Sequence, residues 1–294
     1  MVARMPLDFP NIVPENNLRL PDALTVEYGP APLLSRFVLA GDKAVRQMGI
    51  RLRLRHDFDD LAYVKRHLAE QGIWCPLVNM FNPDYTDLSP KNSFWLSGED
   101  ESGEIVLTWA ARVFYWPDST LKDNVGLFFC DKKDRPVPCH VTADAASALS
   151  SIGGVVFWGG SLWIHPDYRH RRLSPLVGRL GRAFAVSRWP VDWIMCLVMP
   201  IIVEKGVAAG YGYRHMMPGI FFPGSPLGDL DLFLVYLSAS EAYADFGEFL
   251  SAELSGSAYD GDGVSPSTRR LLQTVTSFSL EDVVHGNTSR SYRE

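Results

Sequence analysis

Hydrophobic and polar positions follow two different periods along the chain, so both helices and strands are expected. Residues 58–71 are predicted to form a helix that Asp57 can cap. Its predicted buried face is a stripe at spacings of three and four, formed by Leu61, Val64, Lys65 and Leu68. The segments 103–116 and 153–164 are rich in β-branched and aromatic residues, which predicts two strands. This mixture indicates an α/β protein built around a sheet.

The strand predicted at 153–164 contains two adjacent glycines, Gly159 and Gly160. Glycine inside a strand often marks a bulge or a close approach of another backbone. Two interpretations therefore stay open, a single bulged strand or two short strands joined by a sharp turn.

The pattern continues beyond residue 190. The apolar run 191–203 predicts a buried strand ending near Pro200, and 204–215 predicts a short helix. Residues 219–237 predict two strands joined by a proline-glycine turn, and 241–254 predicts a further helix.

The ends and one internal stretch differ from this pattern. Residues 1–35 are rich in proline and lack helical periodicity, so they are expected to wrap over the surface. The stretch 117–152 has the character of an insertion, with a short helix expected at 142–151. Residues 254–268 have the composition of a glycine and serine linker, and 269–294 form a polar tail.

Composition and charge restrict the function. A chain of 294 residues with 47% hydrophobic content and 8 tryptophans can bury a large core. The net charge of −6 argues against a general nucleic-acid binder. Cys75, Cys130, Cys139 and Cys196 lack the spacing of a metal site, and Cys196 is expected to be a buried free thiol. The longest apolar run, 193–203, is too short to span a bilayer, so a soluble cytoplasmic protein is expected.

Positive charge gathers in one segment of this acidic chain. Residues 165–188 hold six arginines against one aspartate. In the larger segment 162–188, an apolar strand leads into an arginine-rich loop, which opens a helix. Ser174 can cap that helix, and Pro175 suits its first position because the missing donor would be unpaired there. The first amides of a helix bind anions, so a phosphate site is predicted.

This segment is similar to the acyl-CoA-binding motif of the GNAT superfamily, the GCN5-related N-acetyltransferases. In that family a strand ends in a hydrophobic residue, any residue, Pro, two residues and Arg, and the chain continues as Arg/Gln-x-x-Gly-x-Gly/Ala into a helix. The residues that match the lead-in are Ile164, His165, Pro166, Asp167, Tyr168 and Arg169.

Two positions of the motif differ. Arg172 stands in place of the first glycine, and Ser174 in place of the second small residue. Glycine lets the backbone approach a pyrophosphate closely. Arg172 can serve the same ligand if its backbone stays at negative φ and its guanidinium reaches a phosphate.

A second stretch adds to the resemblance, which covers roughly residues 100–237. Gly212-Tyr213 stands where the family has a Gly-Phe-like dipeptide after a helix. The family often has a tyrosine four residues before that glycine, as proton donor to the departing thiolate, and here Ala208 takes its place. Tyr211 is a nearby phenol that can act as the donor. It can equally be a core aromatic residue.

The resemblance implies the fold and the domain limits. The expected fold is α/β (α+β), with a GNAT-like, mixed and mostly antiparallel sheet flanked by helices. An acyltransferase domain is expected over residues 51–240, with the insertion at 117–152. Residues 1–50 and 241–294 are then extensions on either side.

The resemblance also implies an activity, the direct transfer of an acetyl or other acyl group from acyl-CoA to an amine of a small molecule or peptide. Tyr211 is the implied catalytic residue, and no metal, nucleic acid or membrane is expected, while a homodimer stays open. The residues implied to bind acetyl-CoA or another acyl-CoA are Leu162, Trp163, Ile164, Arg169, His170, Arg171, Arg172, Leu173, Ser174 and Pro175.

Other interpretations stay open. The chain can be a non-catalytic protein that binds CoA or another ligand, or an acyltransferase that uses long chains or a carrier protein. The arginines of 169–172 can instead form a solvated patch that contacts acidic groups. Arg179 and Arg182 are expected at the surface, and His165 is either a base or a structural residue. The helix is expected to dock on the sheet through Leu176, Leu180, Ala183 and Phe184.

Overall fold

The computed structural model describes residues 18–130 and 135–254. The expected surface wrap is therefore outside the described residues for 1–17, as are the linker and polar tail for 255–294. No helix in the described ranges is long and apolar enough to cross a membrane.

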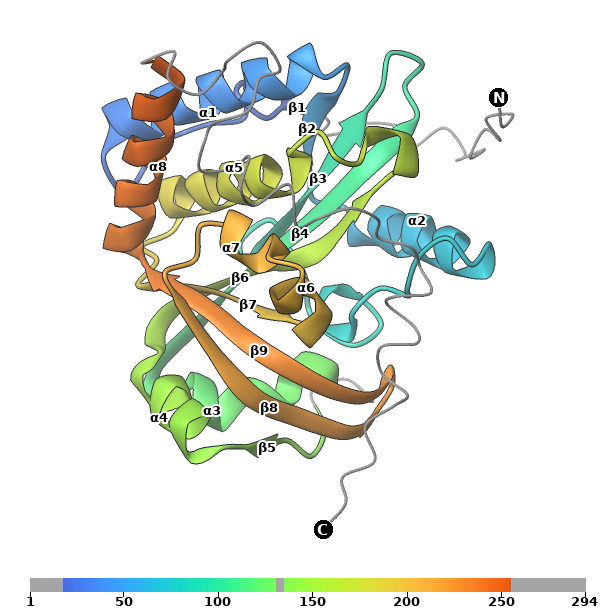
Figure 1. The fold of residues 1–294 in the computed structure, drawn as a ribbon, viewed down its shortest axis with the longest axis vertical. Helices are drawn as coiled ribbons and strands as arrows, with labels where there is room; N and C mark the ends of the chain where they lie inside the picture. Colours follow the sequence, from blue (N-terminus) through green and yellow to red (C-terminus); the bar gives the residue numbers. More distant parts are fainter. Residues whose placement is uncertain (1–17, 131–134, 255–294) are drawn as a thin grey trace. The chain divides into compact units, whose positions relative to one another are not determined.

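The chain divides into two compact units, and Figure 1 labels the elements of both. Unit 1 contains residues 18–113 and 159–190, and unit 2 contains residues 114–158 and 191–254. Two strands, β4 (Ile105–Thr120) and β6 (Gly153–Ile164), contribute to both units. The other elements of unit 1 are β1 (Leu18–Arg19), α1 (Ala31–Gln47), β2 (Arg51–Arg55), α2 (Phe58–Glu70), η1 (Asn79–Phe81), β3 (Ser93–Glu99), η3 (Pro166–Tyr168) and α5 (Leu173–Arg188).

The strands of unit 1 follow the order β1-β2-β3-β4-β6, and the pairs from β1 to β4 are antiparallel. Leu96 pairs with Trp109, and Trp95 pairs with Ala110. Because neighbouring residues of a strand point to opposite faces, Trp109 and Trp95 lie on opposite faces of the sheet. Trp109 contacts α5 at Gly181, whereas the Trp95 indole donates to the Asp57 carbonyl before α2 (2.6 Å). Helices therefore cover both faces.

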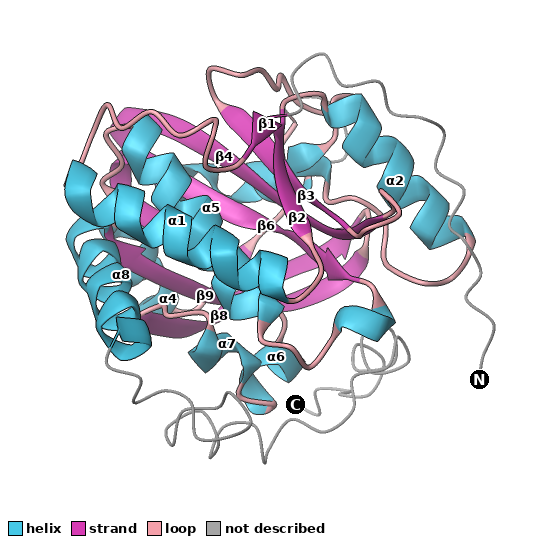
Figure 2. Cartoon of the chain, turned by 90° about the horizontal axis from the view of Figure 1, so that it is seen from above, coloured by secondary structure: helices cyan, strands magenta, loops and turns pink. Residues whose placement is uncertain are grey.

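Helix α1 packs against α5 (Figure 1 and Figure 2). At this contact Gly41 lies against Leu180. The helix begins with Pro32 in its first turn and buries Leu34, Phe37, Val38 and Val45. Its first residues, 31–35, belong to the stretch 1–35 that was expected to lack helix, so that expectation is wrong for them. Burial of one apolar face, rather than helix propensity alone, accounts for the helix.

The strands of unit 2 follow the order β4-β6-β7-β9-β8-β5. The β6–β7 pair is parallel over Val156–Trp158, and the β7–β9, β8–β9 and β5–β8 pairs are antiparallel. The mixed, mostly antiparallel sheet flanked by helices that was expected is therefore confirmed. The elements specific to this unit are α3 (Leu121–Asn124), η2 (Val125–Phe129), β5 (His140–Val141), α4 (Ala143–Ser151), β7 (Trp193–Val198), α6 (Pro200–Glu204), α7 (Val207–Gly210), β8 (His215–Ser225), β9 (Gly228–Ser238) and α8 (Ala239–Leu254).

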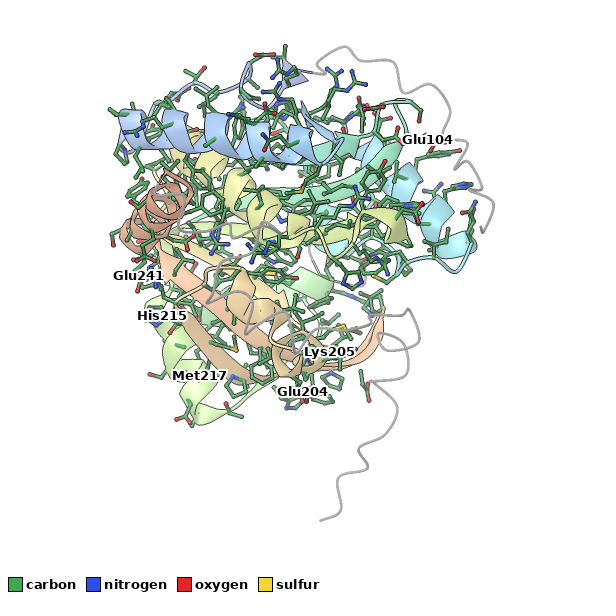
Figure 3. All side chains as sticks on the ribbon, turned by 45° about the horizontal axis from the view of Figure 1, so that its top comes forward. Glu104, Glu204, Lys205, His215, Met217 and Glu241 are labelled. Atoms are coloured by element: carbon green, nitrogen blue, oxygen red, sulfur yellow. The ribbon has the colours of Figure 1, made fainter. Side chains whose placement is uncertain are left out.

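Both carboxylate oxygens of Glu241 fasten α8 to the strands of unit 2. His215 Nε2 lies 2.8 Å from Glu241 Oε1, which joins β8 to the first turn of α8 (Figure 3). The second carboxylate oxygen of Glu241 accepts from the Ser238 amide (2.7 Å). Phe246 of α8 is fully buried, so the helix predicted at 241–254 packs on the core through this side chain.

Several predicted elements differ in their limits. Of the two interpretations left open for 153–164, the sharp turn between two short strands is wrong, since β6 is one strand with a positive φ at Ser161 (54°). The strand β7 ends at Val198, near Pro200 as predicted, and Pro200 then opens α6, because a proline fits the first helical turn. Gly206, at φ 70°, then separates α6 from α7, so 204–215 is not one helix.

The hairpin of unit 2 turns later than expected. Ser225 pairs with Gly228, so Pro226 and Leu227 form a two-residue loop. The Pro223-Gly224 dipeptide lies inside β8, where the register shifts between Phe222 and Ser225. Proline is tolerated there because a bulge needs no ladder hydrogen bond from it.

Candidate functional site

The 165–172 loop leaves β6 and leads into α5 within unit 1. It starts with the short 3₁₀ turn η3, where His165 Nδ1 accepts from the Asp167 amide (3.3 Å) and the His165 carbonyl accepts from the Tyr168 amide (2.9 Å). The Arg169 amide then donates to the Pro166 carbonyl (3.1 Å). His165 thus caps this turn, which favours its structural interpretation over the role of a base.

The backbone of the loop alternates in the sign of φ. His170 has φ 63° and Arg172 has φ 59°, while Arg171 between them is not among the residues with positive φ. Successive residues of alternating handedness turn their N–H groups to one side and form a concave anion-binding nest. A residue other than glycine costs about 1–2 kcal/mol in the left-handed region. The loop therefore stores strain at two positions.

The condition that Arg172 stays at negative φ is not met. Arg172 adopts the left-handed conformation (φ 59°, ψ 22°) that a glycine adopts easily, and it precedes the first residue of α5. The substitution thus keeps a backbone shape suited to glycine and adds strain to it.

The predicted cap of α5 is also wrong. The helix begins at Leu173, and Ser174 and Pro175 are its second and third residues. No side chain caps the helix at Arg172. The amides of Leu173 and Ser174 lie in the first turn, where no partner exists inside the helix, and Pro175 has no amide hydrogen. These two amides follow the nest directly along the chain.

Two arginine side chains brace the loop. Arg169 Nε donates to the Ile164 carbonyl (3.0 Å), its guanidinium lies 5.7 Å from the ring centre of Trp74, and burial lowers its pKa. Arg171 donates to the carbonyls of Asp167 (2.9 Å) and Met48 (3.4 Å). Both guanidinium groups thus contact backbone carbonyl groups, and that of Arg169 also lies over an indole ring.

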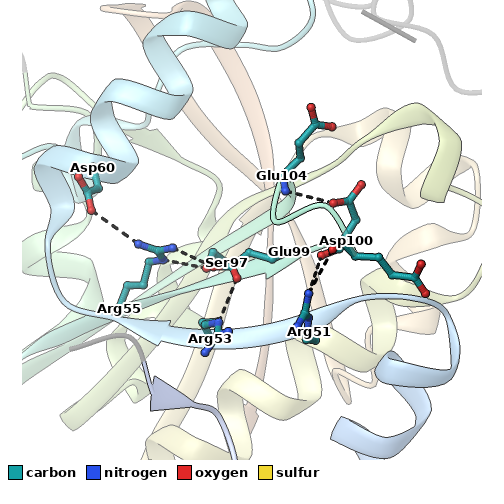
Figure 4. Close-up of polar contacts among 9 residues, drawn as sticks. Arg51, Arg53, Arg55, Asp60, Ser97, Glu99, Asp100 and Glu104 are labelled. Carbon is teal, nitrogen blue, oxygen red and sulfur yellow. Dashed lines mark hydrogen bonds and ion pairs between the residues drawn. The ribbon is translucent and has the colours of Figure 1, made fainter. Parts of the chain in front are cut away.

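The turn after β3 supports the same loop. The Tyr168 hydroxyl donates to Asp100 Oδ2 (3.4 Å), and both side chains are buried. Asp100 Oδ1 accepts from the amides of Ser102 (2.9 Å) and Glu104 (3.1 Å), and the Asp100 carbonyl accepts from Arg51 (3.3 Å; Figure 4). Sequence reasoning missed Asp100 and Trp74, because nothing near them in the sequence indicates a contact with residues 168 and 169.

Strands β2 and β3 carry a buried charged network next to this turn. Glu99 accepts from Arg53 Nε (3.0 Å) and from Arg55 (2.9 Å), while Arg55 Nε donates to Ser97 Oγ (2.8 Å; Figure 4). Arg55 also lies 3.8 Å from Asp60 of α2. These groups satisfy one another, so the network positions β2, β3 and α2.

The end of β6 presents alternating side chains. Trp163 is fully buried, whereas Leu162 and Ile164 are half-buried. The Ser161 carbonyl accepts from Thr108 Oγ1 (3.4 Å) beside the positive φ of Ser161. The irregularity expected from Gly159 and Gly160 thus falls one residue later.

Helix α5 is buried more completely than expected. Leu176, Leu180, Ala183 and Phe184 are buried, as the predicted stripe requires. Arg182 is 2% exposed, so its expected surface position is wrong. The amides of Glu27 and Tyr28 donate to the Ser187 carbonyl (2.8 and 3.0 Å), and α1 also packs on this helix. Residues 27–28 and α1 therefore cover the face of α5 that was expected to be exposed to solvent.

Tyr211 belongs to unit 2, whereas the other predicted site residues belong to unit 1. It packs against a small cluster that includes Val198, Ala208 and Val235. Burial, with a smaller contribution from Cys196, raises the pKa of the Tyr211 phenol, which keeps it protonated at neutral pH. Cys196 is a free thiol as expected, but it is only half-buried. The described residues contain no group of side chains that could hold a metal ion.

Replacing Arg172 by glycine is expected to give a more stable protein than replacing it by alanine, by about 1 kcal/mol. Both variants lose the arginine side chain, but only glycine relieves the positive φ. Urea unfolding of the two variants measures the difference. Equal stabilities would contradict the left-handed conformation of residue 172.

Comparison with known proteins finds similar solved structures but no matching family model or curated sequence. Among solved structures, it is similar to NAA60 of Arabidopsis thaliana in complex with acetyl-CoA, with 14% identity, 64% of this chain and 99% of that chain covered, and a TM-score of 0.41. An uncharacterised protein from Bacillus halodurans has 13% identity, coverage of 69% and 92%, and a TM-score of 0.40. The aminoglycoside acetyltransferase AAC(6')-Ib with coenzyme A and kanamycin has 12% identity, coverage of 65% and 96%, and a TM-score of 0.36.

Proposed function

We propose that the chain is an acyltransferase that moves an acetyl or other acyl group from acyl-CoA to an amine by direct transfer. The observation that supports it best is the alternation of φ at residues 170–172, directly before the first turn of α5. The backbone N–H groups of a nest and of a helix start both favour a bound phosphate. A CoA pyrophosphate is the anion that the sequence motif suggests for this loop.

Each part of the loop has a role in this proposal. The amides between His170 and Ser174 bind the pyrophosphate, while Arg169 and Arg171 hold the loop in its strained shape. A backbone N–H near Ile164 polarises the thioester carbonyl in the manner of an oxyanion hole. Positioning and this polarisation supply most of the acceleration.

The acceptor side completes the proposal. The acceptor is an amine of a small molecule or peptide, which gives up a proton through a carboxylate, a histidine or a water chain before or during its attack on the thioester carbonyl. The C–S bond then breaks, and the leaving thiolate takes a proton from Tyr211. We assign this activity to residues 51–240, with 117–152 as an insertion, and place the protein in the cytoplasm.

A ligand screen followed by an activity assay tests the proposal. Acetyl-CoA, longer acyl-CoAs and free CoA are each expected to raise the unfolding temperature, because they bind the folded state selectively. Thiol release from acetyl-CoA with a panel of amines then measures turnover. Binding without turnover across that panel would favour a non-catalytic protein, and a strong preference for long chains would favour a long-chain acyltransferase. Absence of binding would contradict the proposal.

Replacing Arg169 by alanine is expected to weaken acetyl-CoA binding about tenfold, because the loop loses its bond to the Ile164 carbonyl and its contact with Trp74. Isothermal titration calorimetry measures the affinity. The matched control is Arg188→Ala at the other end of α5, where an arginine also donates to a carbonyl (Pro90, 2.9 Å) and lies over an indole (Trp189, 5.8 Å). Equal losses in both variants would contradict a specific role of Arg169.

Replacing Tyr211 by phenylalanine is expected to slow turnover by about 10²-fold while acetyl-CoA affinity changes little. The phenol is protonated at neutral pH and is lost without a change of ring volume. Steady-state kinetics with thiol detection separates the two effects. Unchanged turnover would assign the proton donor elsewhere.

A further inference from the structure

A buried amine without a partner lies on helix α2. Lys65 shares the inward face of the helix with Leu61, Val64 and Leu68, and it is 1% exposed. Within the described residues, its Nζ has neither a hydrogen-bond partner nor a salt bridge. Lysine is almost never fully buried unless it is paired, because an isolated charge is costly to remove from water. The position thus calls for an explanation beyond packing.

The segment that follows α2, residues 73–75, lies next to this amine. The amides of Ile73 and Trp74 both donate to the Leu68 carbonyl (2.9 and 3.2 Å), which turns the chain back over the end of the helix. Cys75 is the ionisable group whose charge acts on Lys65. Burial lowers the pKa of Lys65 to about 7, and burial raises the pKa of the Cys75 thiol. The amine is therefore close to half-protonated at neutral pH.

The same segment reaches the 165–172 loop. The Arg169 guanidinium lies 5.7 Å from the ring centre of Trp74, and Arg169 Nε donates to the Ile164 carbonyl (3.0 Å). The side chain that supports Arg169 and the thiol that interacts with Lys65 therefore belong to adjacent residues, Trp74 and Cys75. Movement of residues 73–75 would change both contacts together.

We propose that residues 73–75 form a latch on the 165–172 loop, and that the latch opens when the Lys65 amine takes up a proton. A neutral amine is tolerated in the apolar interior, whereas an ammonium group needs water or a counter-charge. Opening of the segment hydrates the ammonium group and removes Trp74 from Arg169. The effect of pH on the latch does not depend on the proposed function. Only the link between the latch and acyl-CoA binding rests on it.

The direction of the pH effect follows from proton linkage. The closed form has a Lys65 pKa of about 7, and in the open form the pKa returns toward the ordinary value of 10.5. Opening therefore becomes more favourable as the pH falls from 10.5 to 7 and levels off below 7. Between pH 9 and pH 7, the ratio of open to closed molecules is expected to rise about fiftyfold.

Alkylation of Cys75 by iodoacetamide reports the opening, and peptide mass spectrometry of the full chain gives its rate at pH 7, 8 and 9. Each rate is divided by the rate for Lys65→Met, which has no titrating amine, so that the ionisation of the thiol cancels. The ratio is expected to fall about fiftyfold from pH 7 to pH 9. A ratio independent of pH would overturn the latch. Lys43→Met, on the exposed face of α1, is the matched control and should behave as the unaltered chain.

A second measurement tests the connection to the loop. Saturating acetyl-CoA is expected to slow the alkylation of Cys75 in the unaltered chain, because a ligand of the loop stabilises the closed form. Binding measured by calorimetry without such protection would overturn the connection. If acetyl-CoA does not bind at all, the proposed function fails, and the pH-dependent ratio alone decides whether the latch exists.

Discussion

Replacing Lys65 by methionine is expected to raise the free energy of unfolding at pH 7 by roughly 3–5 kcal/mol. Methionine fills a similar volume on the inward face of α2 and needs no hydrogen-bond partner. The unaltered chain must keep an amine in the interior, where burial lowers its pKa to about 7, although the unfolded chain protonates it freely. Few single substitutions in this protein should stabilise it as much.

The sign of the pH dependence makes this prediction specific. Because the pKa of Lys65 is lower in the folded chain than the ordinary 10.5, the unfolded chain binds more protons between pH 7 and pH 10.5. The stability of the unaltered chain therefore rises with pH across that window, and the advantage of Lys65→Met shrinks by the same amount. Below pH 7 the advantage is constant.

Urea unfolding at pH 6, 7, 8.5 and 10 measures this advantage, since the midpoint and slope give the free energy at each pH. Lys43→Met is again the control, and it is expected to change stability by no more than about 0.5 kcal/mol at any pH, because its side chain is exposed. An advantage of Lys65→Met that stays constant between pH 7 and pH 10 would contradict the low pKa of the amine.

Elements with a strong local signal are predictable from the sequence. Asp57 caps α2 by accepting from the Asp59 amide (2.9 Å), and Thr142 caps α4 by accepting from the Ala145 amide (3.3 Å). The strand predicted at 153–164 has the limits of β6. In each case a capping side chain or a run of β-branched residues determines the element within a few positions of the chain.

The conformation of the 165–172 loop has no such local signal. The run Arg169-His170-Arg171-Arg172 contains no glycine, and yet two of its residues have positive φ. Residue preferences place the start of the helix at Ser174-Pro175, whereas α5 begins at Leu173. Contacts from distant segments, above all Trp74 and Asp100, hold the loop in this shape, and the order of residues within the loop does not reveal them.

Burial is also decided by distant segments. The spacing of Leu61, Val64, Lys65 and Leu68 predicts that Lys65 lies on the inward face of α2, and the structure confirms it. The same kind of pattern predicts that Arg182 is exposed, which is wrong because α1 and residues 27–28 cover α5 from the side opposite the sheet. The periodicity of a helix identifies the face that packs on a sheet, but it does not show whether other chain segments cover the opposite face.

Strain and buried polarity meet at one place in unit 1. Two residues at positive φ lie in the 165–172 loop, and the orphaned amine of Lys65 is linked to that loop through Trp74. Both features lower stability, and neither is needed to form the sheet or its helices. Backbone strain and buried unpaired polar groups lower the stability of a protein, and they are concentrated where it binds a ligand or changes shape. Their coincidence supports a functional interpretation of the loop and the latch together.

Replacing Gly181 by alanine is expected to lower the free energy of unfolding by about 2–4 kcal/mol. A Cβ at this position would overlap the ring of Trp109, which is 5% exposed and held in the core between β4 and α5. An indole cannot yield as a flexible side chain does, so α5 must move away from the sheet. The 165–172 loop is attached to the start of this helix and would move with it.

Gly178→Ala is the matched control in the same helix, because a Cβ there has no atom within 4 Å. Alanine loses less backbone entropy than glycine on folding, so this variant should gain about 0.5–1 kcal/mol. Urea unfolding measures both variants, and the double variant Gly181→Ala with Trp109→Phe is expected to recover part of the loss through a smaller ring. Similar changes in the two alanine variants would mean that α5 does not rest on Trp109. The stability changes of Gly181→Ala and Gly178→Ala are expected to have opposite signs, because only Gly181 lies against the Trp109 indole. This contact fixes the distance of α5 from the sheet.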